Sequence, residues 1–195
     1  NEEFFARINS NIEVLELFDE IKNKANKDYL TGLYNRRYLF DVGNKIYEDC
    51  KLNGKIFAIA IIDVDNFKNI NDIYGHDIGD IALKEVSKIL NEEILSNALI
   101  SRLGGEEFCI CFYNRTEKQI DELLENIRER FENNIIVYDN KEINYTISIG
   151  YSFDFGKNMD NMINNADRYL YFAKNEGRNR VRKDEGRLTQ SHNIM

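Results

Sequence analysis

The sequence of 195 residues is poor in the residues that build metal sites and disulfides, with two histidines and three cysteines. With only His76 and His192 available, a zinc site built on histidines is not expected. Cys50, Cys109 and Cys111 show no CxxC spacing, and two of them lie in an apolar run. We therefore interpret all three as small core residues in a reducing cytosol.

Two further absences concern membranes and nucleic acids. No apolar run approaches the roughly 18 residues of a transmembrane helix, and no signal peptide is visible. The segment is therefore expected to be cytoplasmic and to make no membrane contact. The net charge is −8, which argues against a nucleic-acid polymer as partner because such domains usually present a basic face. A small anionic substrate would need a metal or a few placed basic residues.

Hydrophobic residues make up 43% of the chain, including 12 Phe and 11 Tyr, so a sizeable core can be buried. The length suits one domain with an extension. Residues 1–27 are predicted to form a helix, either packed on the domain or ending a coiled-coil stalk. The polar residues 183–195 are predicted to be a frayed tail. Because the chain begins at Asn1, we expect an upstream sensor domain, and the parent protein could be membrane-anchored.

Helical and strand-like segments alternate along the chain. Asn35 and Thr116 are predicted N-caps, and Thr116 with Gln119 fits a capping box. The apolar residues 56–62 predict a buried central strand, and residues 99–112 predict a hairpin. Further strands are predicted at 135–138 and 143–152, and the last helix ends near Gly177. This order predicts an α+β fold with a mixed, largely antiparallel sheet flanked by helices.

The hairpin turn places two glycines before two carboxylates, Glu106 and Glu107. Glycine lets a ligand approach the backbone closely and makes positive φ accessible. The acids could hold a metal, or they could simply be solvated on a surface turn. Asp63 directly follows the buried strand, where it could likewise mark a site or a strand that emerges into solvent. If the strands share one sheet, these carboxylates suit Mg²⁺ carried by a nucleoside triphosphate.

Taken together, the motifs resemble the GGDEF family of diguanylate cyclases. They occur in the family's order at residues 28–37, 63–72, 74–80, 104–108, 146–150 and 166–179, and the resemblance covers about residues 28–182. It implies a nucleotidyl-cyclase palm of ferredoxin-like type. It also implies condensation of two GTP into cyclic di-GMP with release of two pyrophosphates, across a homodimer. The segment would be the output domain of a longer protein in bacterial second-messenger signalling.

The resemblance also implies roles for the acidic residues. Asp63 and Glu106 match the metal ligands, and the carbonyl of Val64 would assist. Glu107 matches a position required for activity, so Asp63, Glu106 and Glu107 are the predicted catalytic residues. The cofactor would be Mg²⁺ or Mn²⁺, with two ions in each half-site.

Other matches concern the nucleotide. Asn71 and Asp80 match residues that read guanine, and an ionised Asp can accept from both guanine N1–H and the N2 amino group. The predicted phosphate-binding residues are Phe67, Lys68, Arg102, Lys174 and Arg178. Lys174 and Arg178 are four residues apart, so they are expected to point the same way from the C-terminal end of the last helix.

Two departures from the family pattern stand out. Glu106 replaces the usual Asp, which is a common active variant. Residues 95–98 read Leu-Ser-Asn-Ala where many members carry an inhibitory Arg-x-x-Asp site, so that site is predicted to be missing. Two alternatives remain open. One is a catalytically silent domain that binds GTP or cyclic di-GMP, and the other is a cyclase that makes an adenine-containing product, against which Asp80 argues.

Overall fold

The computed structural model describes residue 22 and residues 24–139 and 141–184. Most of the helix predicted at 1–27 lies outside these residues, although residues 22 and 24–26 are helical. Most of the tail predicted at 183–195 also lies outside them, and Lys183 itself ends a short strand. Within the part of the chain that the structure describes, no helix is long and apolar enough to cross a membrane.

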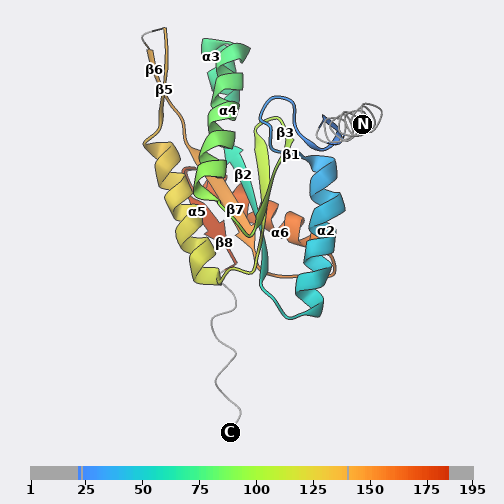
Figure 1. Ribbon diagram of the computed structural model, residues 1–195. Helices are drawn as coiled ribbons and strands as arrows, with labels where there is room; N and C mark the ends of the chain where they lie inside the picture. The colour runs from blue at the N-terminus through green and yellow to red at the C-terminus, as the bar shows by residue number, and fades with distance from the viewer. Residues whose placement is uncertain (1–21, 23, 140, 185–195) are drawn as a thin grey trace, which may run out of the picture.

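A six-stranded sheet forms the centre of the fold, and Figure 1 shows helices on both of its faces. Its strand order is β1-β3-β4-β2-β7-β8. The inner strands pair antiparallel, whereas β1 and β8 add parallel edges. This is the predicted mixed, largely antiparallel sheet. The strands are β1 (Tyr34–Asn35), β2 (Phe57–Val64), β3 (Ala98–Gly104), β4 (Glu107–Tyr113), β7 (Ile147–Ser152) and β8 (Val181–Lys183).

Strand β2 lies at the centre, and every one of its residues is buried. Alternate side chains enter two separate core clusters, because successive residues of a strand point to opposite faces. Helices α3 (Phe67–Tyr74), α4 (His76–Glu93) and α5 (Glu117–Glu132) pack in the first cluster. Helices α2 (Arg36–Leu52) and α6 (Met159–Asn175) pack in the second. The end of β2 therefore emerges between two helical layers.

Both predicted helix caps are present. The Asn35 side chain accepts a hydrogen bond from the backbone N–H of Tyr38 and opens α2. Thr116 and Gln119 form a reciprocal capping box at the start of α5. These local signals are strong because a helix N-terminus leaves backbone N–H groups that need acceptors.

The strand predicted at 143–152 is wrong as one element. It is divided into β6 (Lys141–Asn144), which pairs with β5 (Ile135–Tyr138), and β7, which joins the main sheet. Figure 1 shows the β5–β6 hairpin projecting beyond the sheet. Ile143, Tyr145 and Ile147 are all buried, so the alternating pattern runs through the break and hides it. The prediction also missed β1 and β8, which are too short to show a period.

Helix α6 lies unusually close to β7. A Cβ atom added to Gly150 would lie 2.0 Å from the backbone N of Leu170 and 2.2 Å from the carbonyl oxygen of Ala166. Only glycine fits at this contact, which holds α6 against β7 at Ala166 and Leu170. The fold thereby brings the last residues of α6 to the carboxylates that follow the central strand.

Candidate active site

The site begins where β2 ends. In the antiparallel register, Asp63 lies opposite Glu107 on β4 and opposite Ser148 on β7. The backbone N–H of Val64 donates to the carbonyl oxygen of Glu106 at 3.4 Å. The carboxylates of two segments more than forty residues apart are therefore neighbours on one sheet, and Asp63 is only 5% exposed.

A small cavity of about 150 Å³ opens at this edge. It lies between the end of β2, the start of α3, the hairpin turn and the end of α6. Its lining contains all three predicted metal ligands and four of the five predicted phosphate-binding residues. The lining residues are Asp63, Val64, Asp65, Asn66, Phe67, Lys68, Glu106, Lys174 and Arg178.

The electrostatics of the cavity centre on Asp63. Burial raises its pKa to about 6, and the nearby carboxylates of Glu106 and Glu107 add to that rise. Lys174 acts in the opposite direction, with its Nζ atom 2.8 Å from the Asp63 Oδ2 atom. Lys174 is thus the cation that lowers the pKa of Asp63, while Glu106 and Glu107 raise it. Binding of a further cation beside these carboxylates would therefore be favourable.

The oxygen donors at the cavity fit a magnesium or manganese ion. Asp63, Glu106 and the carbonyl of Val64 are hard oxygen ligands of the kind that Mg²⁺ prefers. Among the described residues, no group of three His, Cys, Asp or Glu side chains is already arranged to hold a metal. That is compatible with an ion that takes one or two carboxylates and completes its shell with phosphates and water.

The start of α3 faces the same cavity. Asn66 has a left-handed backbone conformation with φ 54°, and its side chain makes no capping hydrogen bond. The first backbone N–H groups of a helix have no acceptor within the helix, so those of Phe67 and Lys68 are available to an anion. The carboxylates and these amides together could hold a metal and a phosphate side by side.

Lys174 and Arg178 both reach the cavity, but the predicted reason was wrong. Helix α6 ends at Asn175, so Arg178 is not on it. Gly177 has φ 119°, and the backbone N–H of Arg178 donates to the carbonyl oxygen of Ala173 at 3.0 Å. This is a Schellman-type end to the helix. Arg178 therefore reaches the cavity from a turn whose backbone geometry the sequence spacing did not reveal.

Arg102 does not line the cavity. Its Nε and Nη2 atoms donate to the carbonyl oxygen of Gly105 at 3.0 and 2.8 Å, and its Nη1 atom donates to Asp28 Oδ1 at 3.0 Å. Gly104 and Gly105 take φ values of 150° and 53°, which explains the need for glycine at this turn. The structure thus places Arg102 as a support for the turn that carries Glu106, and phosphate binding by Arg102 stays a prediction.

The two predicted guanine-reading residues come from neighbouring helices. The Asn71 side chain of α3 reaches α4, where a Cβ atom on Gly79 would lie 2.0 Å from the Asn71 Oδ1 atom. Asp80 is the next residue of α4 and is exposed. Neither lines the 150 Å³ cavity. Asn71 lies on α3, whose first residues line that cavity, and Asp80 lies on the neighbouring α4.

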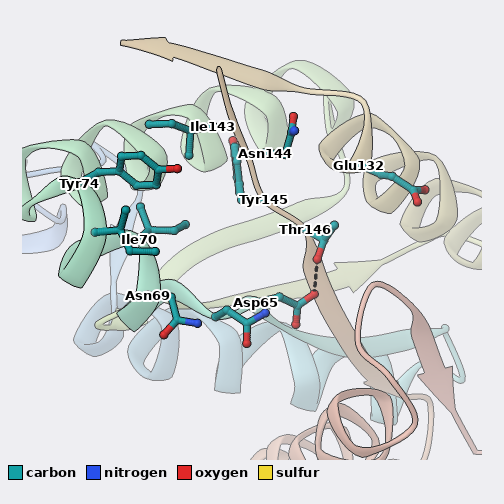
Figure 2. A pocket seen from close by; sticks show the side chains of 11 residues that line it. Asp65, Asn69, Ile70, Tyr74, Glu132, Ile143, Asn144, Tyr145 and Thr146 are labelled. Carbon is teal, nitrogen blue, oxygen red and sulfur yellow. Dashed lines mark hydrogen bonds between the residues drawn. The ribbon is translucent and has the colours of Figure 1, made fainter. Parts of the chain in front are cut away.

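Asp65 is a site residue for which sequence analysis predicted no role. It is 4% exposed, and its carboxylate accepts from Thr146 Oγ1 and Ser148 Oγ, both at 2.7 Å, and from the Asn179 backbone N–H at 3.1 Å. Figure 2 shows it beside a second cavity, of about 320 Å³, between α3 and the segment 143–146. The alternation of β2, which places Asp65 on the side of Asp63, was the available signal.

Comparison with known proteins agrees with this geometry. The profile of the family described as "Diguanylate cyclase, GGDEF domain" matches residues 25–180. Diguanylate cyclase A of Treponema denticola is 37% identical over 170 residues, which cover 84% of this chain and 46% of that protein. The chain spans about half the length of the curated relatives it matches.

Two of the solved structures similar to this one illustrate the match. The coiled coil and GGDEF domain of DgcB from Caulobacter crescentus, in complex with c-di-GMP, has a TM-score of 0.85 at 26% identity, covering 94% of this chain and 98% of that one. The active GGEEF domain of a diguanylate cyclase from Vibrio cholerae has a TM-score of 0.71 at 32% identity, covering 76% and 96%. The fold, the clustered motif residues and these relatives lead to one conclusion: the chain belongs to the GGDEF family of diguanylate cyclase domains.

Proposed function

We propose that this chain condenses two GTP molecules into cyclic di-GMP and releases two pyrophosphates. The observation that carries the proposal is the single cavity where Asp63, Val64 and Glu106 meet Lys174 and Arg178. A metal-binding oxygen set and two phosphate-binding cations in one place are what phosphoryl transfer requires. The known activity of a family member that also carries Glu at the third motif position supports the proposal.

Each residue has a distinct part in the proposed reaction. Asp63, Glu106 and the Val64 carbonyl hold two Mg²⁺ or Mn²⁺ ions, which when bound neutralise phosphate charge and favour attack by a hydroxyl. Lys174 and Arg178 grip the terminal phosphates, and the first amides of α3, at Phe67 and Lys68, cradle them. Glu107 completes the acidic set beside Asp63 and is required for turnover. Arg102 supports the turn that presents Glu106.

Base selection falls to Asn71 and Asp80. An exposed aspartate can accept from the two donors of guanine, N1–H and the N2 amino group. A bound base would cover the carboxylate, and adenine, which lacks that pair of donors, would then leave it desolvated without a partner, at a cost of about 1–3 kcal/mol. GTP is therefore the proposed substrate, and a product that contains adenine is disfavoured.

Catalysis requires two copies of the domain. One cavity holds one triphosphate, so the 3′-hydroxyl that attacks its α-phosphate comes from a nucleotide on a second copy. A sensor domain upstream in a longer parent protein would bring two copies together. Residues 95–98 lack the charged pair of an Arg-x-x-Asp site, so we propose that product inhibition through that site is missing.

Chromatography of products tests this function directly. The protein is incubated with GTP, ATP and Mg²⁺ over a range of protein concentrations. Cyclic di-GMP formed from GTP alone, at a rate that rises faster than linearly with dilute protein, supports the proposal. Absence of product at high protein concentration, with GTP still bound, would indicate a silent binding domain. A product that contains adenine would refute the proposed base selection.

A further inference from the structure

Arg178 reaches the cavity from a turn with an unfavourable backbone. Arg178 has φ 64° and Asn179 has φ 46°, so two successive residues with Cβ atoms are left-handed. Such a conformation is unfavourable for an arginine and more readily adopted by an asparagine, so surrounding contacts are needed to hold both residues in it. The turn lies between α6 and β8, and the Schellman bond from the Arg178 N–H fixes only its first half.

The second half of the turn is fixed by Asp65. The Oδ2 atom of Asp65 accepts the backbone N–H of Asn179 at 3.1 Å. The other two bonds to this carboxylate come from Thr146 and Ser148 at the start of β7, and Figure 2 shows the Asp65–Thr146 bond. A buried carboxylate that accepts three hydrogen bonds from protein groups is an anchor, because those donors would be left unpaired if it moved.

The side chain of Asn179 gives the turn a second attachment. Its Oδ1 atom accepts from Arg128 at 3.0 Å, and its Nδ2 atom donates to Glu132 at 2.8 Å, both on α5. By contrast, no ion pair involves the Arg178 guanidinium among the residues that the structure describes, and Arg178 is exposed. The turn is therefore held at Asn179, and the neighbouring arginine is left available to a ligand.

We propose that Asp65 is a positioning residue for nucleotide binding, which holds the left-handed turn at Asn179 so that Arg178 faces the phosphate cavity. The inference rests on the proposed function, because it takes the ligand of Arg178 to be the terminal phosphates of GTP. Asp65 follows the predicted metal ligand Asp63 by two residues on the same strand end. One short segment thereby carries the predicted metal ligand Asp63 and, through the bond from Asp65 to Asn179, positions the phosphate-binding Arg178.

Steady-state kinetics with GTP tests the inference through Asp65→Ala. This change removes the acceptor for the Asn179 N–H, so Arg178 loses its fixed approach and the KM for GTP rises about tenfold. The kcat changes by less than about threefold, because the carboxylates at the metal site are untouched. Asp65→Asn keeps one carbonyl oxygen that can accept the Asn179 N–H, so it should restore a KM close to that of the wild type.

Two further variants separate positioning from general stability. In an Arg178→Ala background, Asp65→Ala should raise the KM by less than about twofold more, because both changes remove the same interaction. Thr146→Val removes a different hydrogen bond to the same carboxylate, so it should leave the KM unchanged. Amide hydrogen exchange without nucleotide should be faster at Asn179 in Asp65→Ala and unchanged there in Thr146→Val. If Asp65→Ala does not fold, Asp65→Ser replaces it, since its hydroxyl is too short to reach Asn179.

Effects of Asp65→Ala and Arg178→Ala that multiply in the double variant would overturn the inference. So would a rise in KM with Thr146→Val equal to that with Asp65→Ala. Either result leaves the proposed function intact, because the wild type still converts GTP. A wild-type protein that neither binds nor converts GTP overturns the proposed function, and the inference falls with it.

Discussion

Asp63 and Asp65 leave the same end of β2 and are almost equally buried, at 5% and 4% exposure, yet their surroundings differ. Asp65 accepts three hydrogen bonds from fixed protein groups. Asp63 has one lysine, which is itself partly exposed, and two further carboxylates nearby. A buried carboxylate that the protein satisfies is a structural anchor, whereas one left crowded by like charge is prepared for a cation from outside.

The largest effect that tests this comparison is the loss of activity in Asp63→Asn. Removing one metal-binding carboxylate should lower cyclic di-GMP formation about a thousandfold, measured by chromatography. The free energy of unfolding at pH 7 without metal should stay the same or rise, because a buried charge with a raised pKa is removed. A clear loss of stability in urea unfolding would show that Asp63 is also a structural anchor.

Asp65→Ala should lower the stability of the fold, whereas Asp63→Asn should not. Three donors lose their acceptor in a buried place, so the free energy of unfolding should fall by about 3 kcal/mol, measured by urea denaturation. Asp72→Asn is a matched control, since Asp72 is exposed on α3 and should change stability by less than about 0.5 kcal/mol. Equal effects of the two substitutions would break the comparison.

The pH dependence of metal binding should follow the pKa of Asp63. That pKa lies at about 6 in the folded protein, so Mn²⁺ affinity should fall as the pH drops through about 6 and the carboxylate is protonated. Lys174→Met removes the cation that lowers this pKa, so the midpoint should move to higher pH. Paramagnetic resonance of free Mn²⁺ gives the titration. Lys68 lines the same cavity but is not the ion-pair partner of Asp63, so Lys68→Met is the control and should leave the midpoint pH unchanged.

The raised pKa of Asp63 also determines how this residue affects the pH dependence of stability in the absence of metal. Its folded pKa is above the ordinary value of 3.8, so the folded state holds the proton more tightly between pH 3.8 and about 6. The contribution of Asp63 to the free energy of unfolding is therefore greatest below pH 3.8, and it is lost as the pH rises through 6. Unfolding of the wild type and Asp63→Asn across this range measures the difference, and a contribution that grows with pH would contradict it.

The smallest effect concerns a third aspartate, Asp80, which is exposed and is proposed to bind the guanine base of GTP. Asp80→Asn should reduce the preference for GTP over ATP about tenfold, because one acceptor of the guanine donors is lost. Stability should be unchanged, in contrast to Asp65→Ala. Competition binding with the two nucleotides measures the preference, and an unchanged ratio would show that Asp80 does not read the base.

Some features of the site could be predicted from the sequence because their cause is local or lies in motif order. The caps at Asn35 and Thr116 follow from side-chain chemistry within one turn. The buried strand ending at Asp63 follows from a continuous apolar run, and the meeting of Asp63 with Glu106 follows once both segments share a sheet. The family resemblance supplied other members of the cavity, including Lys174 and Arg178, but not Asp65 or Asn66.

Other features could not be predicted, because they depend on hydrogen bonds between distant segments. The hydrogen bonds of the Arg102 guanidinium to Gly105 and to Asp28, 74 residues away in the sequence, were not predicted, and its binding of phosphate stays a prediction. Asp65 had no predicted partner, since Thr146, Ser148 and Asn179 lie 81 or more residues further along the chain. The break at 145–146 was hidden because the alternation of buried residues continues through it.

The sequence by itself determined which chemical groups the protein has for its task and the order of the elements that carry them. Apolar periodicity and capping residues act over a few positions, so strands, helices and the acidic turn are encoded where they stand. Only the tertiary structure decided that Asp63 and Asp65, at the end of β2, have different surroundings and therefore different roles. Asp65 is satisfied by groups that folding brings to it from β7 and the α6–β8 turn, whereas Asp63 faces Lys174 and like charges. Burial makes that difference strong, because an unpaired charge away from water is costly and a hydrogen-bonded one is not.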